Sequence, residues 1–164
     1  MQIPKRIQNN FNFESNKLSG DNTLISGKII CCNKSNFNLR ICGEVLSNFF
    51  LGKYLFSETG NIKTMLICKE CSTKLILFDS TIDGYRNCTE NLDNKNMQSE
   101  REWNCPKCND NNFSVYAKYE YPNMEELKEL GIKEKDNAFT WIVITVKCNN
   151  CGKVYKGFVD FDAT

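Results

Sequence analysis

Hydrophobic residues gather in short runs bounded by polar residues, a pattern more typical of β-strands than of long helices. Residues 37–42, 62–67, 113–121 and 139–147 are rich in β-branched and aromatic side chains, and each run predicts a strand. Residues 44–56 are more apolar still, and their periodicity leaves strand and helix open. The pattern therefore predicts a mainly β fold built from antiparallel units.

One short helix is expected as an insertion at residues 123–131. Asn123 can cap its start, acidic residues fill its first turn, and Gly131 stands at its end. Residues 1–23 are polar and lack clear alternation, so we treat them as an N-terminal extension. Three apolar residues of this extension could dock on the body of the protein: Phe11, Phe13 and Leu18.

The chain resembles itself over two segments. The sequence that begins at Cys32 aligns without a gap with the one at Cys108, and each has a Phe five residues later. The sequences at Cys71 and Cys151 also align, with a Phe seven residues after each Cys. This order predicts a tandem duplication. Three parts are then expected: a first unit at 24–88, a linker at 89–100 and a second unit at 101–164.

Cysteine is the residue type that carries chemistry in this chain. There are 10 Cys and no His, which excludes Ser-His-Asp triads, Cys-His dyads and His-based zinc hydrolases. Two Cys-x-x-Cys turns brought together place four sulfurs at the corners of a tetrahedron, the arrangement that holds Zn²⁺ in structural sites. Three such pairs are present: Cys68 with Cys71, Cys105 with Cys108, and Cys148 with Cys151.

The second unit resembles a zinc ribbon. The resemblance is carried by Cys105-Pro-Lys-Cys108, by the strand at 113–121, and by a strand that leads into Cys148-Asn-Asn-Cys151-Gly. It implies paired β-hairpins around one structural zinc ion, and we expect four ligands: Cys105, Cys108, Cys148 and Cys151. The Gly that usually follows a zinc-ribbon turn is present only once, since the three turns are followed by Gly152, Asn109 and Ser72.

The first unit has one complete pair, Cys68 and Cys71. Cys32 aligns with Cys108 of the second unit. The residue that aligns with Cys105 is Ile29, which cannot bind metal. We favour Cys31 as the fourth ligand, although adjacent cysteines on a strand point apart and need an irregular backbone to reach one ion. Two other cysteines are alternatives for that place, Cys42 and Cys88, and the site could also be empty or degenerate. Two zinc ions per chain are thus expected.

The charge balance and the hydropathy of the chain limit the kinds of partner that it is expected to bind. Lys and Arg total 21 against 20 Asp and Glu, and no segment is strongly basic. Two zinc ions, each held by four thiolates, would take the net charge to about −3, so phosphate attraction alone would hold a partner weakly. No run approaches the roughly 18 apolar residues of a membrane span. We expect a cytoplasmic protein without membrane contact, in a compartment where thiols stay reduced.

A closed four-cysteine site leaves no coordination position for substrate or activated water, so we expect no enzyme. The leading hypothesis is a structural zinc protein that recognises another protein. Single-stranded nucleic-acid binding is an alternative, favoured by basic and aromatic residues interleaved at 116–119 and 153–156. An inhibitor or immunity protein is another, and a rubredoxin-like iron protein a third. Abundant Asn, Lys and Ile fit an AT-rich genome, as of a bacterium or phage.

Two further expectations concern the interior and the surface. We expect the zinc clamps to take the place of a large hydrophobic interior. The acidic pairs Asp79/Asp83 and Glu125/Glu126 are interpreted as a turn and a solvated helix start, not as catalysts. Seven aromatic residues are candidates for contact with a partner, although each is explained as well by covering a small core: Trp103, Tyr116, Tyr119, Tyr121, Phe49, Phe50 and Tyr54.

Overall fold

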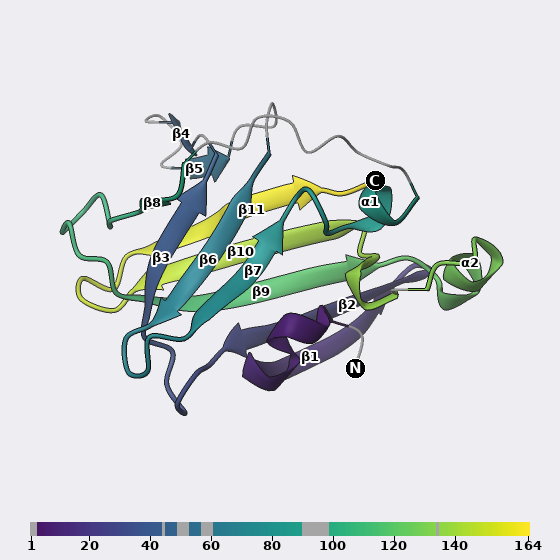
Figure 1. The fold of residues 1–164 in the computed structure, drawn as a ribbon, viewed down its shortest axis with the longest axis horizontal. Helices are drawn as coiled ribbons and strands as arrows, with labels where there is room; N and C mark the ends of the chain where they lie inside the picture. Colours follow the sequence, from purple (N-terminus) through teal and green to yellow (C-terminus); the bar gives the residue numbers. More distant parts are fainter. Residues whose placement is uncertain (1–2, 44, 49–52, 57–60, 90–98, 134) are drawn as a thin grey trace.

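The computed structural model describes residues 3–43, 45–48, 53–56, 61–89, 99–133 and 135–164 (Figure 1). The fold is mainly β with antiparallel pairing, which confirms the predicted fold class. Within these residues nine strands form one sheet and two more form a separate hairpin. No helix in the described part of the chain is both long enough and apolar enough to cross a membrane.

The described elements are strands, with four short helices between or before them. The strands are β1 (Phe11–Ser19), β2 (Asn22–Ile29), β3 (Phe37–Cys42), β4 (Val45–Asn48), β5 (Lys53–Phe56), β6 (Lys63–Cys68), β7 (Lys74–Asp79), β8 (Arg101–Glu102), β9 (Phe113–Tyr121), β10 (Trp141–Cys148) and β11 (Val154–Asp162). The helices are η1 (Lys5–Asn10), α1 (Tyr85–Thr89), α2 (Met124–Glu129) and η2 (Lys135–Asn137).

The predicted strands and the predicted helix are present. The four runs rich in β-branched and aromatic residues form β3, β6, β9 and β10, and the described parts of 44–56 are strands β4 and β5. In α2, Asn123 Oδ1 accepts a hydrogen bond of 3.0 Å from the backbone N–H of Glu125. Gly131 has a φ of 66°, which suits its place just after the helix.

Two three-stranded ladders are built in the same register. In β3–β6–β7, Phe37 pairs with Cys68. In β9–β10–β11, Phe113 pairs with Cys148. Each ladder has a register shift a few residues beyond its cysteine turn, between β6 and β7 and between β10 and β11. This likeness is what duplication of one unit would produce. The ladders are joined into one sheet where Phe37 pairs with Phe113. The β1–β2 hairpin is added to the same sheet where β2 pairs with β9.

A continuous hydrophobic core fills the space between the ladders. Figure 1 shows β3, β6 and β7 crossing in front of β9, β10 and β11, so two sheet faces enclose it. Tyr119 is fully buried, with its ring 5.1 Å from that of Phe139, and Trp103 packs 4.6 Å from Phe158 between ring centroids. The expectation that zinc takes the place of a large interior is therefore wrong, because inward-facing residues of both ladders meet over one extended core.

The N-terminal segment is part of this body. Helix η1 and strand β1 lead into β2, to which β1 is paired along its length. Phe11 is buried, whereas Phe13 and Leu18 are exposed, so only the first of the three candidate residues docks on the core. The guanidinium of Arg6 binds the buried carboxylate of Asp83 and also donates to the carbonyl of Ile76. These bonds fix η1 against the end of β7.

Candidate metal centres

Each of the three Cys-x-x-Cys segments forms the same turn. The N–H of the residue after the second Cys donates to the carbonyl of the first Cys, at 2.9 Å in the Cys68 turn, 2.7 Å in the Cys105 turn and 3.0 Å in the Cys148 turn. The residue that donates has a positive φ in every case: 59° at Ser72, 58° at Asn109 and 71° at Gly152. The turn thus needs a left-handed residue at this place whether or not it is Gly.

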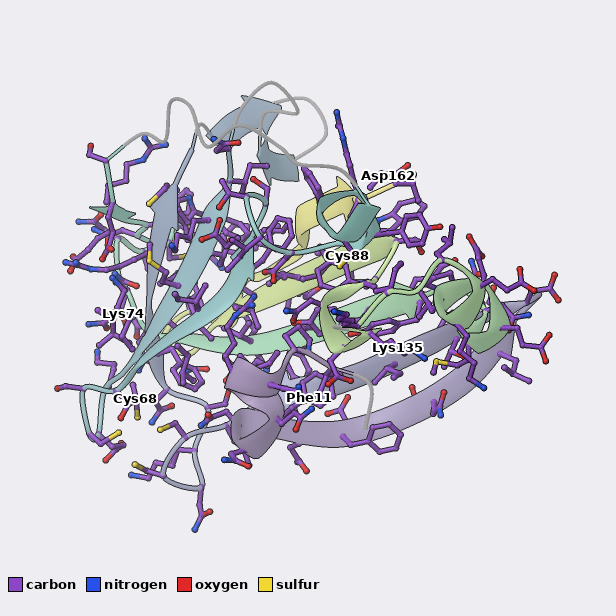
Figure 2. All side chains as sticks on the ribbon, turned by 45° about the vertical axis from the view of Figure 1, so that its right-hand side comes forward. Phe11, Cys68, Lys74, Cys88, Lys135 and Asp162 are labelled. Carbon is purple, nitrogen blue, oxygen red and sulfur yellow. The ribbon has the colours of Figure 1, made fainter. Side chains whose placement is uncertain are left out.

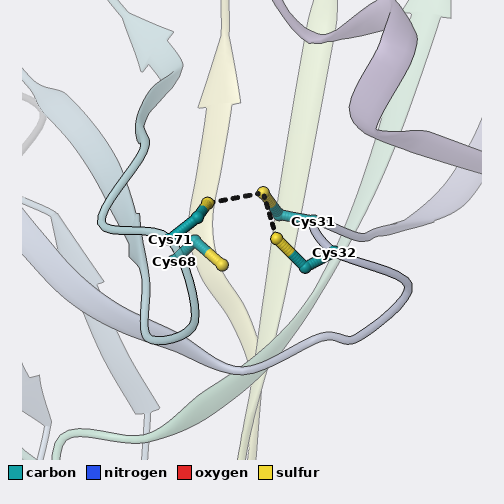
Figure 3. Close-up of side chains that lie close together, drawn as sticks. All are labelled: Cys31, Cys32, Cys68 and Cys71. Carbon is teal, nitrogen blue, oxygen red and sulfur yellow. Dashed lines mark hydrogen bonds between the residues drawn. The ribbon is translucent and has the colours of Figure 1, made fainter.

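Cys31 and Cys32 belong to a different kind of turn. Residues 31–34 form a tight β-turn, closed by a hydrogen bond of 3.0 Å from the N–H of Lys34 to the carbonyl of Cys31. Cys32 and Asn33 have φ values of 52° and 59°, which is the conformation of a type I′ turn. This is an irregular backbone of the kind that lets adjacent cysteines face one ion. Both side chains turn to the same side in Figure 3.

The first tetrad consists of Cys31, Cys32, Cys68 and Cys71, whose sulfurs all lie within 4.8 Å of one another. The Sγ atom of Cys31 is 3.5 Å from that of Cys71 and 4.0 Å from that of Cys32 (Figure 3). Cys32 and Cys71 are exposed, while Cys68 is buried. The structure therefore brings together the four cysteines favoured by the sequence, at an open edge of the molecule.

The second tetrad consists of Cys105, Cys108, Cys148 and Cys151, also within 4.8 Å of one another. The Sγ atoms of Cys105 and Cys151 are 3.6 Å apart, and those of Cys108 and Cys148 are 3.5 Å apart. Cys105 and Cys148 are buried, and the other two are partly buried. This tetrad is more sheltered from solvent than the first.

The sulfur spacing fits a tetrahedral metal ion. A Zn–S bond of about 2.3 Å places the sulfurs of a regular tetrahedron about 3.8 Å apart, and the sulfur–sulfur distances given above for both tetrads, 3.5 to 4.0 Å, lie around that value. All eight thiols are free and not joined as disulfides. A donor set of four thiolates is the one that zinc prefers in structural sites, and it also suits iron of the rubredoxin type.

The tetrads differ from isolated thiols in their acidity. Hydrogen bonds from Thr73 lower the pKa of Cys71 to about 6, whereas burial and bonds to neighbouring thiols raise the pKa of Cys31 to about 12. In the second tetrad, burial raises the pKa of Cys148 to about 12. Each tetrad thus contains a thiol that resists ionisation beside its neighbours. A bound dication would remove that resistance by compensating the negative charge.

Polar side chains next to the tetrads support one sulfur in each. The hydroxyl of Thr73 lies 3.1 Å from Cys71 Sγ, and the hydroxyl of Tyr155 lies 3.0 Å from Cys105 Sγ. Burial acts to raise the pKa of Cys105, but the bond to Tyr155 and backbone N–H groups outweigh it and lower this pKa to about 6. Sequence reasoning missed both supporting residues. The available signal was their place a few residues after the second Cys of a turn, Thr73 just before β7 and Tyr155 within β11.

Cys42 and Cys88, the alternative ligands, do not join either tetrad in the described residues. Cys42 pairs with Lys63 at the far end of β3, five residues and so about 17 Å along the strand from Phe37, which pairs with Cys68. Burial raises the pKa of Cys42, as expected of a thiol in an apolar place. Cys88 lies on α1, well away from Cys68 in Figure 2.

Most of the aromatic contact candidates that can be assessed belong to the core. Trp103, Tyr119 and Tyr121 are buried, so they are not surface residues. Tyr116 is partly exposed on the outer face of β9. Phe49 and Phe50 lie outside the described residues, and so does the side chain of Tyr54.

The acidic pairs have the predicted structural places. Asp79 and Asp83 form a closed turn, in which the carboxylate of Asp83 accepts a bond of 2.8 Å from the N–H of Asp79. Glu125 and Glu126 are exposed in the first turn of α2.

Comparison with known proteins adds no family to this geometry. No protein-family model, no curated protein and no solved structure matches the chain. The likeness to zinc ribbons therefore rests on the cysteine turns and on the hairpins that present them.

Proposed function

We propose that this chain is a non-catalytic zinc-binding protein that acts by recognising another protein. The observation that carries the proposal is that each tetrad supplies four cysteine sulfurs to one point. Four thiolates complete the tetrahedral coordination of Zn²⁺ and leave no place for substrate or an activated water. The metal would then hold the ends of the hairpins in position instead of performing chemistry.

Metal analysis tests the first half of the proposal. The chain is purified under reducing conditions without added metal, and zinc and iron are measured per chain. We expect about two zinc ions, one after Cys71→Ser or Cys151→Ser, and still two after Cys42→Ser, which lies outside both tetrads. Visible absorption together with bound iron would identify the metal centre as rubredoxin-like iron instead of zinc. Less than one metal ion per chain would contradict the proposal.

An exposed aromatic residue on a rigid strand supports the second half. Trp141 on β10 is 43% exposed, and its indole N–H donates a bond of 2.7 Å to the carboxylate of Asp160 on β11. Large aromatic residues held in this way are typical of binding hot spots in protein interfaces. Trp141 was not among the aromatic candidates taken from the sequence.

Affinity purification of the tagged, zinc-containing chain from its native host tests this half. We expect a specific protein to be captured, and to be lost with Trp141→Ser. Leu130→Ser is the matched control, because Leu130 is exposed to a similar degree on another part of the molecule, 53% against 43%. Equal capture by both variants, or no capture at all, would contradict recognition through Trp141.

Single-stranded nucleic acid is a second candidate partner, favoured by one contact. The ammonium of Lys28 lies 5.6 Å from the centre of the Tyr116 ring, on the outer face of β2 and β9. Aromatic rings beside cations are the usual stacking sites for unpaired bases. Binding of labelled oligonucleotides over a range of salt concentrations tests this candidate, and absence of binding at the lowest salt excludes it.

A further inference from the structure

The two tetrads are connected by a network of hydrogen bonds centred on Asn149. This residue lies inside the Cys148–Cys151 turn of the second tetrad. Its side-chain nitrogen approaches the carbonyl of Ser35 at 3.1 Å and Oδ1 of Asn36 at 3.2 Å, both in the first unit. The same nitrogen is 2.9 Å from Oδ1 of Asn112 in the second unit. One side chain thus contacts both units.

The oxygen of this amide is also held. Asn149 Oδ1 lies 2.7 Å from the hydroxyl of Ser114, and that hydroxyl is 2.9 Å from the carbonyl of Ser35. Ser35 and Ser114 are buried at 7% and 9% exposure, and Ser35 Oγ accepts from the N–H of Val115 at 3.3 Å. Breaking the bonds at Ser35 and Ser114 would leave buried polar groups unsatisfied, which holds this part of the network in place, whereas Asn149 itself is exposed to solvent.

The network ends at both turns of the first tetrad. Ser35 and Asn36 come directly after the turn of residues 31–34, which carries two of its cysteines. The carbonyl of Asn36 accepts a bond of 3.0 Å from the N–H of Lys69, which lies between Cys68 and Cys71. In the second unit, the N–H of Asn149 donates at 2.8 Å to the carbonyl of Asn112. The two tetrads therefore share one polar junction.

We propose that zinc binds the two tetrads with positive cooperativity and that Asn149 transmits the coupling. The inference rests on the proposed zinc-binding function. A bound ion orders the turns of its own tetrad. Because Asn149 and Asn36 connect the turns of the two tetrads, ordering one tetrad also holds the turns of the other in position. The second ion then binds with less loss of conformational freedom. Asn149 is a positioning residue, because it does not touch the metal.

Zinc affinity measured by competition with a chromophoric chelator tests the coupling. The second tetrad is measured in the intact chain and in a chain whose first tetrad is disabled by Cys32→Ser and Cys71→Ser. We expect the intact chain to bind its second-tetrad zinc about tenfold more tightly, within the usual range of coupling between sites. The reciprocal pair, with Cys108→Ser and Cys151→Ser, should give the same factor. Equal affinities in intact and disabled chains would overturn the proposal.

Substitutions at the junction test whether Asn149 transmits the coupling. Asn149→Ala should abolish the tenfold difference and leave both tetrads able to bind zinc, whereas Asn150→Ala, at an exposed neighbour in the same turn, should keep it. Loss of coupling in both variants would overturn the role of Asn149. If Asn149→Ala does not fold, Ser114→Ala removes the junction from the other side without altering a cysteine turn. A chain that binds no zinc at all would refute the proposed function itself, which is a different result from independent binding.

Discussion

Backbone strain in this protein is concentrated at the metal-binding turns. Among the described residues, the non-glycine residues with positive φ are Cys32, Asn33, Ser72 and Asn109, and all four belong to cysteine turns. For Cys and Ser this conformation costs about 1 kcal/mol or more, while Asn tolerates it better. Such strain persists where other interactions over-determine the backbone. Here a metal–sulfur bond at each turn would be that interaction.

The hydroxyl of Tyr155 provides a test of the support given to one sulfur. Tyr155→Phe removes the bond to Cys105 Sγ and keeps the ring, which packs edge-on against Trp103 at 5.1 Å between centroids. We expect zinc affinity of the second tetrad to fall by about tenfold, since partners that hold metal ligands typically contribute that much. Competition with a chelator measures the effect.

Tyr116→Phe is the control for this prediction, because the Tyr116 ring lies partly exposed on the outer face of β9, whereas the Tyr155 ring is buried with its hydroxyl beside Cys105. It should leave zinc affinity unchanged. An unchanged affinity in Tyr155→Phe as well would show that the hydroxyl contributes nothing to the metal site.

At the scale of elements, η1 depends on one buried ion pair. The carboxylate of Asp83 is fully buried, and Arg6 reaches it from η1 with two nitrogens, one at 2.7 Å. Arg6→Ala would leave this carboxylate without its charged partner. We expect the free energy of unfolding to fall by about 3 kcal/mol, because a buried charge that loses its partner is strongly destabilising. Urea denaturation measures the change.

The matched control is Lys5→Ala, a substitution at an exposed neighbour on the same short helix. It should change the free energy of unfolding by less than about 0.5 kcal/mol, as surface substitutions usually do. A small effect of Arg6→Ala would mean that η1 is held by the buried side chains of Ile7 and of Ile3, which precedes the helix, instead of by the ion pair.

The sequence predicted β3, β6, β9 and β10 because each is a compact run of β-branched and aromatic residues between turns. It did not predict β1, because residues 1–23 are polar and lack clear alternation. It could not predict how the ladders face each other, since that packing joins residues far apart in the chain. Tyr119 and Tyr121 illustrate the difference. They continue the inward alternation of Phe113 and Val115 along β9, so the signal was present, but only the second ladder explains why this face is covered.

The second tetrad followed from two Cys-x-x-Cys pairs together with the resemblance of the second unit to a zinc ribbon, since the chain has three such pairs and spacing alone does not choose between them. The first tetrad was harder, because its place depends on a type I′ turn with Cys32 at a position where Cys has no preference. The junction at Asn149 was not predicted, since Asn is abundant and its partners lie 113 and 114 residues away in the chain.

At the scale of the whole molecule, the tetrads differ in their access to solvent. The first has two exposed cysteines, and the second has none. We expect excess chelator to remove zinc from the intact chain in two phases of about equal amplitude, the first tetrad releasing its ion faster. Stopped-flow absorbance of the chelator complex resolves the phases. The extended core should keep the sheet folded after the fast phase.

Cys71→Ser should delete the fast phase and Cys151→Ser the slow one. Release in a single phase from the intact chain, or a fast phase that survives Cys71→Ser, would show that exposure does not decide the order of release.

The side-by-side placement of the two tetrads also determines the electrostatic character of that end of the molecule. Two zinc ions with eight thiolates would concentrate a formal charge of about −4 there. Five exposed lysines lie in or beside the four turns: Lys34, Lys69, Lys107, Lys147 and Lys153. With the carboxylates of Glu70 and Asp110 included, about −1 remains. Negatively charged metal centres and lysine ammonium groups thus lie close together. Their opposite charges largely cancel, and salt screens the remaining electrostatic potential within about one Debye length of the surface.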